Sequence, residues 1–147
     1  MSGTEASSED YAGVTAKTHE DGFPVIYVFD STPPKQQEVE KYPWLMVLSW
    51  KYDGSANNGM PSKELIATMN PLEDALEDHT VRLGVSRHSY NRTGNNYREF
   101  VYYITNQEEF LEEFNIAVED HPQYPIEINF YNDTKWDDLI SVQNMVK

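Results

Sequence analysis

The sequence of 147 residues contains no cysteine. This absence excludes disulfide bonds, thiolate zinc sites and a cysteine nucleophile, and it fits a reducing compartment. The first residues lack the basic start and apolar run of a signal peptide. No stretch reaches the roughly 18 apolar residues that a membrane-spanning helix needs. We therefore expect a cytoplasmic protein that does not bind membranes.

Basic residues are scarce. The chain has 11 Lys and Arg against 25 Asp and Glu, which gives a formal net charge of -14. Such a charge disfavours binding to nucleic acid or to anionic lipid, because both depend on cationic surface. It favours docking to a basic protein partner, while the sequence carries no signal for an oligomeric state.

Catalytic and cofactor motifs are also missing. The glycines form neither a GxGxxG nor a GxxxxGK[ST] phosphate-binding loop, and there is no GxSxG nucleophile motif. The first helix carries no Glu-x-x-His metal pattern, so we interpret its carboxylates as a solvated face: Glu73, Asp74, Glu77 and Asp78. The histidines lack ligand spacing. We expect no cofactor, no metal and no catalytic residue.

The composition that is present favours one folded domain. Hydrophobic residues make up 39% of the chain and aromatic residues 13%, which is enough to build an ordinary core. Residues 1–21 are polar and without periodicity, so we predict a flexible tail there. Residues 22–147 are predicted to form a single α+β domain.

Apolar patterns predict the elements of this domain. Strands are expected at residues 24–29, 44–52, 81–90, 97–105 and 125–131. Helices are expected at 62–80 and 107–120, with a kink or restart at Asn70-Pro71 and an N-cap at Asn106, and a short helix follows Asp133. From residue 44 the order is βαββαβ. This order predicts a ferredoxin-like core, an antiparallel sheet with two helices on one face, extended by an N-terminal strand and a C-terminal helix.

All four arginines fall within residues 81–98, a stretch without Asp or Glu. It carries a charge of +4 while the rest of the chain carries -18. Two interpretations stay open: the arginines pair with carboxylates of the same domain, or the hairpin offers a site for an anion or a partner. The second interpretation names these possible contacts: Arg82, Arg87, His88, Arg92 and Arg98.

Several short motifs, in order, resemble a bacterial family, the domain of unknown function 695. They are Asn58-Gly59-Met60-Pro61, Leu72-Glu73-Asp74-Ala75-Leu76, Thr93-Gly94, Arg98-Glu99, Tyr102-Tyr103, Tyr124-Pro125, Asp133 and Trp136. The resemblance spans residues 22–140, and this chain has Asp133-Thr134-Lys135-Trp136 where the family pattern has Asp-Pro-x-Trp. More distantly, the family is similar to the regulator of ribonuclease E activity B, an acidic α+β inhibitor.

The resemblance implies a binding or regulatory role and carries over no site residue. We therefore expect a non-enzymatic protein-binding module, an inhibitor or modulator that docks to a basic partner. The alternative is a small enzyme or ligand-binding domain with an anion pocket near the arginine-bearing hairpin.

Overall fold

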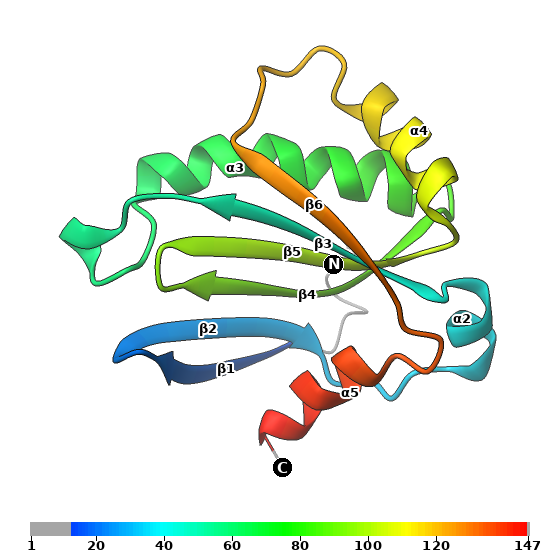
Figure 1. The fold of residues 1–147 in the computed structure, drawn as a ribbon, viewed down its shortest axis with the longest axis horizontal. Helices are drawn as coiled ribbons and strands as arrows, with labels where there is room; N and C mark the ends of the chain where they lie inside the picture. The colour runs from blue at the N-terminus through cyan, green and yellow to red at the C-terminus, as the bar shows by residue number, and fades with distance from the viewer. Residues whose placement is uncertain (1–12, 147) are drawn as a thin grey trace, which may run out of the picture.

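The computed structural model describes residues 13–146, which form a mixed α+β fold around one six-stranded antiparallel sheet (Figure 1). The strand order is β1-β2-β4-β5-β3-β6, and all neighbouring strands are antiparallel. The elements in chain order are β1 Gly13–Glu20, β2 Phe23–Asp30, α2 Gln36–Lys41, β3 Trp44–Lys51, α3 Lys63–Ala75, β4 Ser86–Gly94, β5 Tyr97–Ile104, α4 Gln107–Ala117, β6 Ile126–Asn132 and α5 Asp137–Gln143. A π-helical turn, Leu76–Val81, continues α3.

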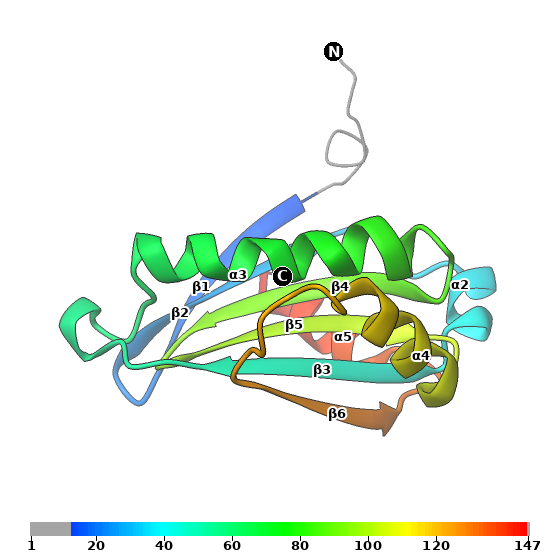
Figure 2. The ribbon, with the colours of Figure 1, turned by 90° about the horizontal axis from the view of Figure 1, so that it is seen from above.

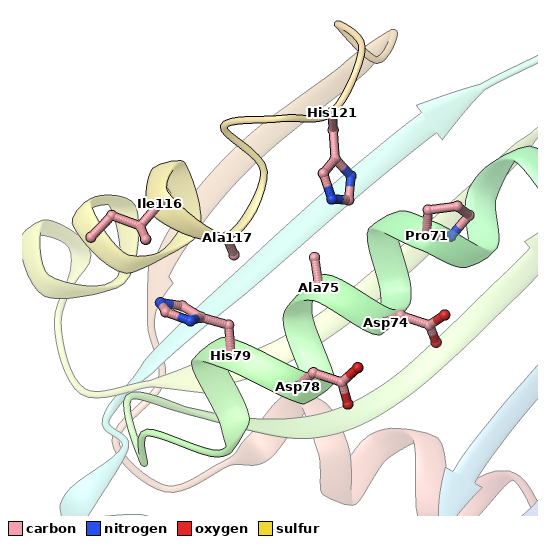
Figure 3. A pocket seen from close by; sticks show the side chains of 8 residues that line it. All are labelled: Pro71, Asp74, Ala75, Asp78, His79, Ile116, Ala117 and His121. Atoms are coloured by element: carbon pink, nitrogen blue, oxygen red, sulfur yellow. The ribbon is translucent and has the colours of Figure 1, made fainter.

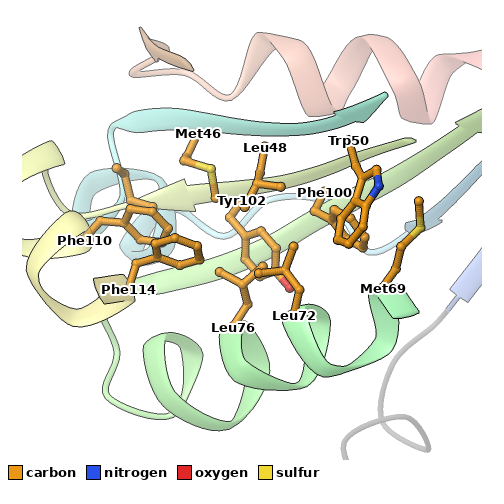
Figure 4. Close-up of a cluster of buried hydrophobic side chains, with 11 residues drawn as sticks. Met46, Leu48, Trp50, Met69, Leu72, Leu76, Phe100, Tyr102, Phe110 and Phe114 are labelled. Carbon is orange, nitrogen blue, oxygen red and sulfur yellow. The ribbon is translucent and has the colours of Figure 1, made fainter. Parts of the chain in front are cut away.

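Two of the helices, α3 and α4, cover one face of the sheet, as the sequence predicted (Figure 2). Ser62 caps α3 by accepting a hydrogen bond from the Leu65 amide at 3.1 Å, and Asn106 caps α4 in the same way through the Glu109 amide at 2.8 Å. The cap at Asn106 confirms the prediction. Their apolar faces meet the strands in a core of eleven buried side chains (Figure 4): Met46, Leu48, Trp50, Met69, Leu72, Leu76, Phe100, Tyr102, Ile104, Phe110 and Phe114.

The short helix α5 covers part of the opposite face of the sheet. The Asp133 carboxylate, which precedes the helix, accepts hydrogen bonds from its first two amides, those of Asp137 at 2.9 Å and Asp138 at 3.0 Å. Trp136 is fully buried beneath the helix, stacks on Tyr103 with a centroid distance of 4.4 Å, and donates its indole N–H to the Tyr42 carbonyl at 2.8 Å. Trp136 and Tyr103 belong to a second cluster of buried hydrophobic side chains, on the α5 side of the sheet. This cluster anchors the C-terminal segment to the sheet.

The predicted strand at 81–90 begins too early. The alternation of Val81, Leu83 and Val85 suggested a strand, but residues 76–81 continue the helix and the strand starts only at residue 86. Gly84, at φ +78°, ends the helical segment in the left-handed conformation, and the Val85 amide closes the end by donating to the Thr80 carbonyl at 3.1 Å. Leu83 is 56% exposed, so it never belonged to a buried strand face.

Two further predictions need correction. Residues 13–20 of the predicted flexible tail form strand β1, which pairs with β2 along its whole length; residues 1–12 of that tail lie outside the described residues. Helix α3 runs without a break through Pro71, so the restart predicted as one alternative at Asn70-Pro71 does not occur. Because Met69 and Leu72 are fully buried on either side of the proline, packing against the sheet holds the helix together there.

Candidate functional site

The predicted arginine site is divided between the two faces of the sheet. Successive side chains of a strand point to opposite faces. Arg87 is opposite Tyr103 in the ladder and lies on the α5 side, while His88 is opposite Tyr102 and lies on the α3 side. An irregularity in the ladder between His88 and Tyr90 shifts the alternation along β4, so Arg92, opposite Glu99, is on the α5 side like Arg87, while Arg98 is on the α3 side. Arg82 is exposed in the turn before β4.

On the α5 side, carboxylates already occupy both guanidinium groups. Arg87 binds Glu38 at 2.9 Å through Nε and lies 3.7 Å from Asp30. The side chain of Arg92 is only 2% exposed, binds Glu20 at 2.7 Å, and donates to the carbonyls of Gly94 and Tyr97. These ion pairs connect β4 to β1 through Glu20 and to α2 through Glu38.

On the α3 side, a polar network joins the sheet to α3 and to the π-helical turn that continues it. The Asn91 amide donates to Glu73 at 2.7 Å and contacts His88 Nε2 at 3.0 Å, while Arg98 lies 3.7 Å from Glu73. The buried Tyr102 hydroxyl donates to Glu77 at 2.5 Å. The prediction of a solvated face is therefore wrong for Glu73, which is half-buried and accepts a hydrogen bond from Asn91. Glu77 is exposed as predicted, but it also accepts a hydrogen bond from Tyr102.

Asp74 and Asp78 are exposed as predicted, and they border a groove between α3 and α4. The groove has a volume of about 530 Å³ and is open to solvent. Its lining comes from both helices, the π-helical turn and the segment after α4: Pro71, Asp74, Ala75, Asp78, His79, Ile116, Ala117 and His121. In Figure 3, Ala75 and Ala117 lie across the groove from one another, and the two carboxylates are on the outer side of α3.

Both histidines of the groove have hydrogen-bond partners. His79 Nε2 lies 2.9 Å from Glu113 Oε1, which links the π-helical turn to α4. His121 Nδ1 lies 2.7 Å from the Tyr124 hydroxyl. Turns of π-helix occur frequently at functional sites, and this one carries His79 to the rim of the groove. Asp74 and Asp78 were predicted to share one helix face, whereas His121 and Ile116 could not be connected with them, because only tertiary packing brings these residues together.

Negative charge is concentrated on this side of the molecule. We define the helical layer as residues 63–81 and 107–120. It holds eleven carboxylates and one lysine, Lys63, and thus a net charge of -10 out of -14 for the chain. A layer of one sign creates a field that attracts cationic molecules from solution.

Burial raises the pKa of two carboxyl groups on the opposite face. Desolvation raises the pKa of Glu99, and the nearby Arg92 guanidinium opposes this effect. Desolvation also raises the pKa of Asp138, although the Tyr90 hydroxyl donates to its carboxylate at 2.8 Å and opposes the shift.

Within residues 13–146, no three His, Asp or Glu side chains are grouped so that they could hold a metal ion. No helix in that range is long and apolar enough to span a membrane.

Gly59, one of the residues that carry the family resemblance, helps to hold the fold together. Gly59, at φ +83°, accepts hydrogen bonds through its carbonyl from the Tyr52 hydroxyl at 2.8 Å and the Asn96 amide at 2.9 Å. Burial raises the pKa of Tyr52 to about 12, so the hydroxyl stays a donor at neutral pH. The loop before α3 is thereby fixed to the tip of the β4–β5 hairpin.

The fold and the site thus define a class: a small α+β protein with an antiparallel sheet, an acidic helical layer and an open groove. The chain belongs to the family of unknown function DUF695, whose model matches residues 15–141. Comparison with curated proteins and with solved structures gave no match.

Proposed function

We propose that the protein is a non-enzymatic protein-binding or regulatory module whose helical layer docks to a basic partner. The observation that carries this proposal is the charge of -10 on one layer, next to a groove that is lined by both apolar and polar side chains. Electrostatic complementarity of this kind steers association and selects partners. An inhibitor or modulator that acts by binding needs only such a surface.

We also infer that β3 to β6 with α3 and α4 form a ferredoxin-like core. The sheet order β4-β5-β3-β6 and the antiparallel pairing support this inference, since both agree with a βαββαβ unit. The hairpin β1–β2 then extends the core beyond β4. A distant relation to the regulator of ribonuclease E activity B remains a prediction.

The alternative function is a small enzyme or ligand-binding domain with an anion pocket near the hairpin. The carboxylates beside Arg87, Arg92 and Arg98 speak against it, because an incoming anion would have to displace them. Arg82 is the exposed arginine of the group. We therefore use Arg82 to distinguish the two functions.

The test needs charge changes that leave the fold intact. Glu73 and Glu77 are unsuitable, because they bind Asn91 and Tyr102. Asp74 and Asp78 are exposed, and no described residue forms an ion pair with either of them. The double variant Asp74→Lys/Asp78→Lys should melt at nearly the same temperature as the unchanged protein, since surface substitutions usually change stability by only about 0.5 kcal/mol.

The partner is first isolated by affinity capture with the unchanged chain, and its association rate is then measured by surface plasmon resonance. We expect the rate to fall on the order of tenfold with the double variant, and to fall again when salt is raised to about 0.3 M. Arg82→Ala is the control and should leave the rate unchanged. Binding that is indifferent to salt and to the double variant, but lost with Arg82→Ala, would favour the ligand-pocket alternative.

A further inference from the structure

We propose that the groove between α3 and α4 receives an amphipathic helical segment of the partner that carries Lys or Arg beside aliphatic residues. This inference rests on the proposed function and names the element that would make contact. It concerns the residues that line the groove rather than the charge of the layer as a whole.

The walls of the groove suit an aliphatic side chain. Ala75 and Ala117 leave room between the helices, and Ile116 is 49% exposed at the border (Figure 3). An exposed isoleucine beside two alanines gives apolar surface that a partner could remove from water, at about 25 cal/mol per Å². Small side chains also permit the close approach of a second helix backbone.

The border of the groove suits a cation. No lysine or arginine of residues 13–146 lines it, while Asp74 and Asp78 follow one another along the exposed side of α3. Their spacing of four residues places them one helical turn apart. Lysine or arginine at the same spacing on a partner helix would meet both carboxylates while the aliphatic stems cover the alanines.

Both properties together disfavour other occupants. A purely cationic chain would leave Ile116 and the alanines exposed, and an acidic helix would meet the carboxylates of the layer. Binding helices in apolar grooves is a recurrent mode of peptide recognition, in which residues at helical spacing act as anchors. The groove with its acidic border therefore selects a basic amphipathic helix.

Three synthetic peptides of equal length test this inference by isothermal titration calorimetry against the full chain. The first has lysine and leucine on opposite helix faces, the second has serine in place of leucine, and the third has glutamate in place of lysine. We expect the lysine–leucine peptide to bind at least about tenfold more tightly than the lysine–serine peptide, which corresponds to 1.4 kcal/mol. The glutamate peptide should not bind.

A matched pair of variants locates the site. Ala117→Trp fills the groove without a change of charge, and Asn115→Trp places the same ring on an exposed part of α4 that does not line the groove. The first should weaken binding of the lysine–leucine peptide at least about tenfold, and the second should leave it unchanged. As a check that needs no variant, the ring resonances of His79 and His121 should shift when this peptide is added to the unchanged protein.

Two outcomes would overturn the inference, and they differ in meaning. If both lysine peptides bind equally and Ala117→Trp has no effect, the helical layer docks cations without using the groove, and the proposed function stands. If neither lysine peptide binds at low salt, the proposed function fails together with the inference. Unshifted histidine resonances during binding would count against the groove even if a tryptophan variant failed to fold.

Discussion

Replacement of Trp136 should show how much the C-terminal segment contributes to stability. The indole is fully buried, lies parallel to the Tyr103 ring within 9°, and donates to the Tyr42 carbonyl. Trp136→Phe keeps an aromatic ring but leaves that carbonyl without its donor, which costs about 1 kcal/mol, and it leaves a small cavity that costs about as much again. Trp136→Ala removes nearly the whole side chain, and we expect a loss of about 4 kcal/mol or more.

These losses are large compared with the roughly 5–15 kcal/mol that stabilise a typical domain. For a chain of this size, Trp136→Phe should lower the melting temperature by roughly 4–8 °C. Urea denaturation followed by far-UV circular dichroism measures the free energy of unfolding without depending on tryptophan fluorescence. Ile140→Ala, on the helix that follows Trp136 but 38% exposed, is the control and should cost under about 1 kcal/mol. Equal and small losses for both Trp136 variants would refute the anchoring role.

Two other substitutions test the sheet. Gly94→Ala would place a Cβ 2.3 Å from the Pro24 carbonyl oxygen at φ +146°, so we expect a loss of about 2 kcal/mol or more in the urea assay, against about 1 kcal/mol for Gly22→Ala, whose Cβ would meet no atom within 4 Å. Glu99 has a raised pKa, so the folded state binds its proton more tightly than the unfolded state, and its contribution to stability is lost as the pH rises through the pKa of the folded state. Glu99→Gln should therefore raise the melting temperature at pH 7 and leave it nearly unchanged at pH 3, and a lower melting temperature at pH 7 would contradict this reasoning.

Elements with strong local signals were predictable from the sequence. Asn106 and Glu109 identified the start of α4, and the run from residue 44 identified a strand that proved to be covered on both faces. β1 was missed because an edge strand needs few apolar residues, and only Ala16 of β1 is buried. At residues 81–85, local alternation imitated a strand, while the tertiary packing of Leu76 and Thr80 continued the helix.

The candidate site was less predictable for the same reason. Asp74 and Asp78 are neighbours on one helix, so their shared exposure could be inferred from their spacing. His121 joins them only because α4 packs beside α3, and no sequence pattern encodes that proximity. The arginines illustrate the reverse case. A clear sequence cluster was dispersed, because strand alternation sends Arg87 and Arg98 to opposite faces.

The arginines of the hairpin and the carboxylates of the helical layer have different consequences for stability. Three of the four arginines are paired with carboxylates, whereas the helical layer has a single lysine to offset eleven carboxylates. Like charges in such a layer repel one another, and lysines four residues from its glutamates would relieve this repulsion at little structural cost. Added salt screens the same repulsion. Salt should therefore stabilise the folded protein while it slows association with a basic partner, so a slower association at high salt cannot be the result of unfolding.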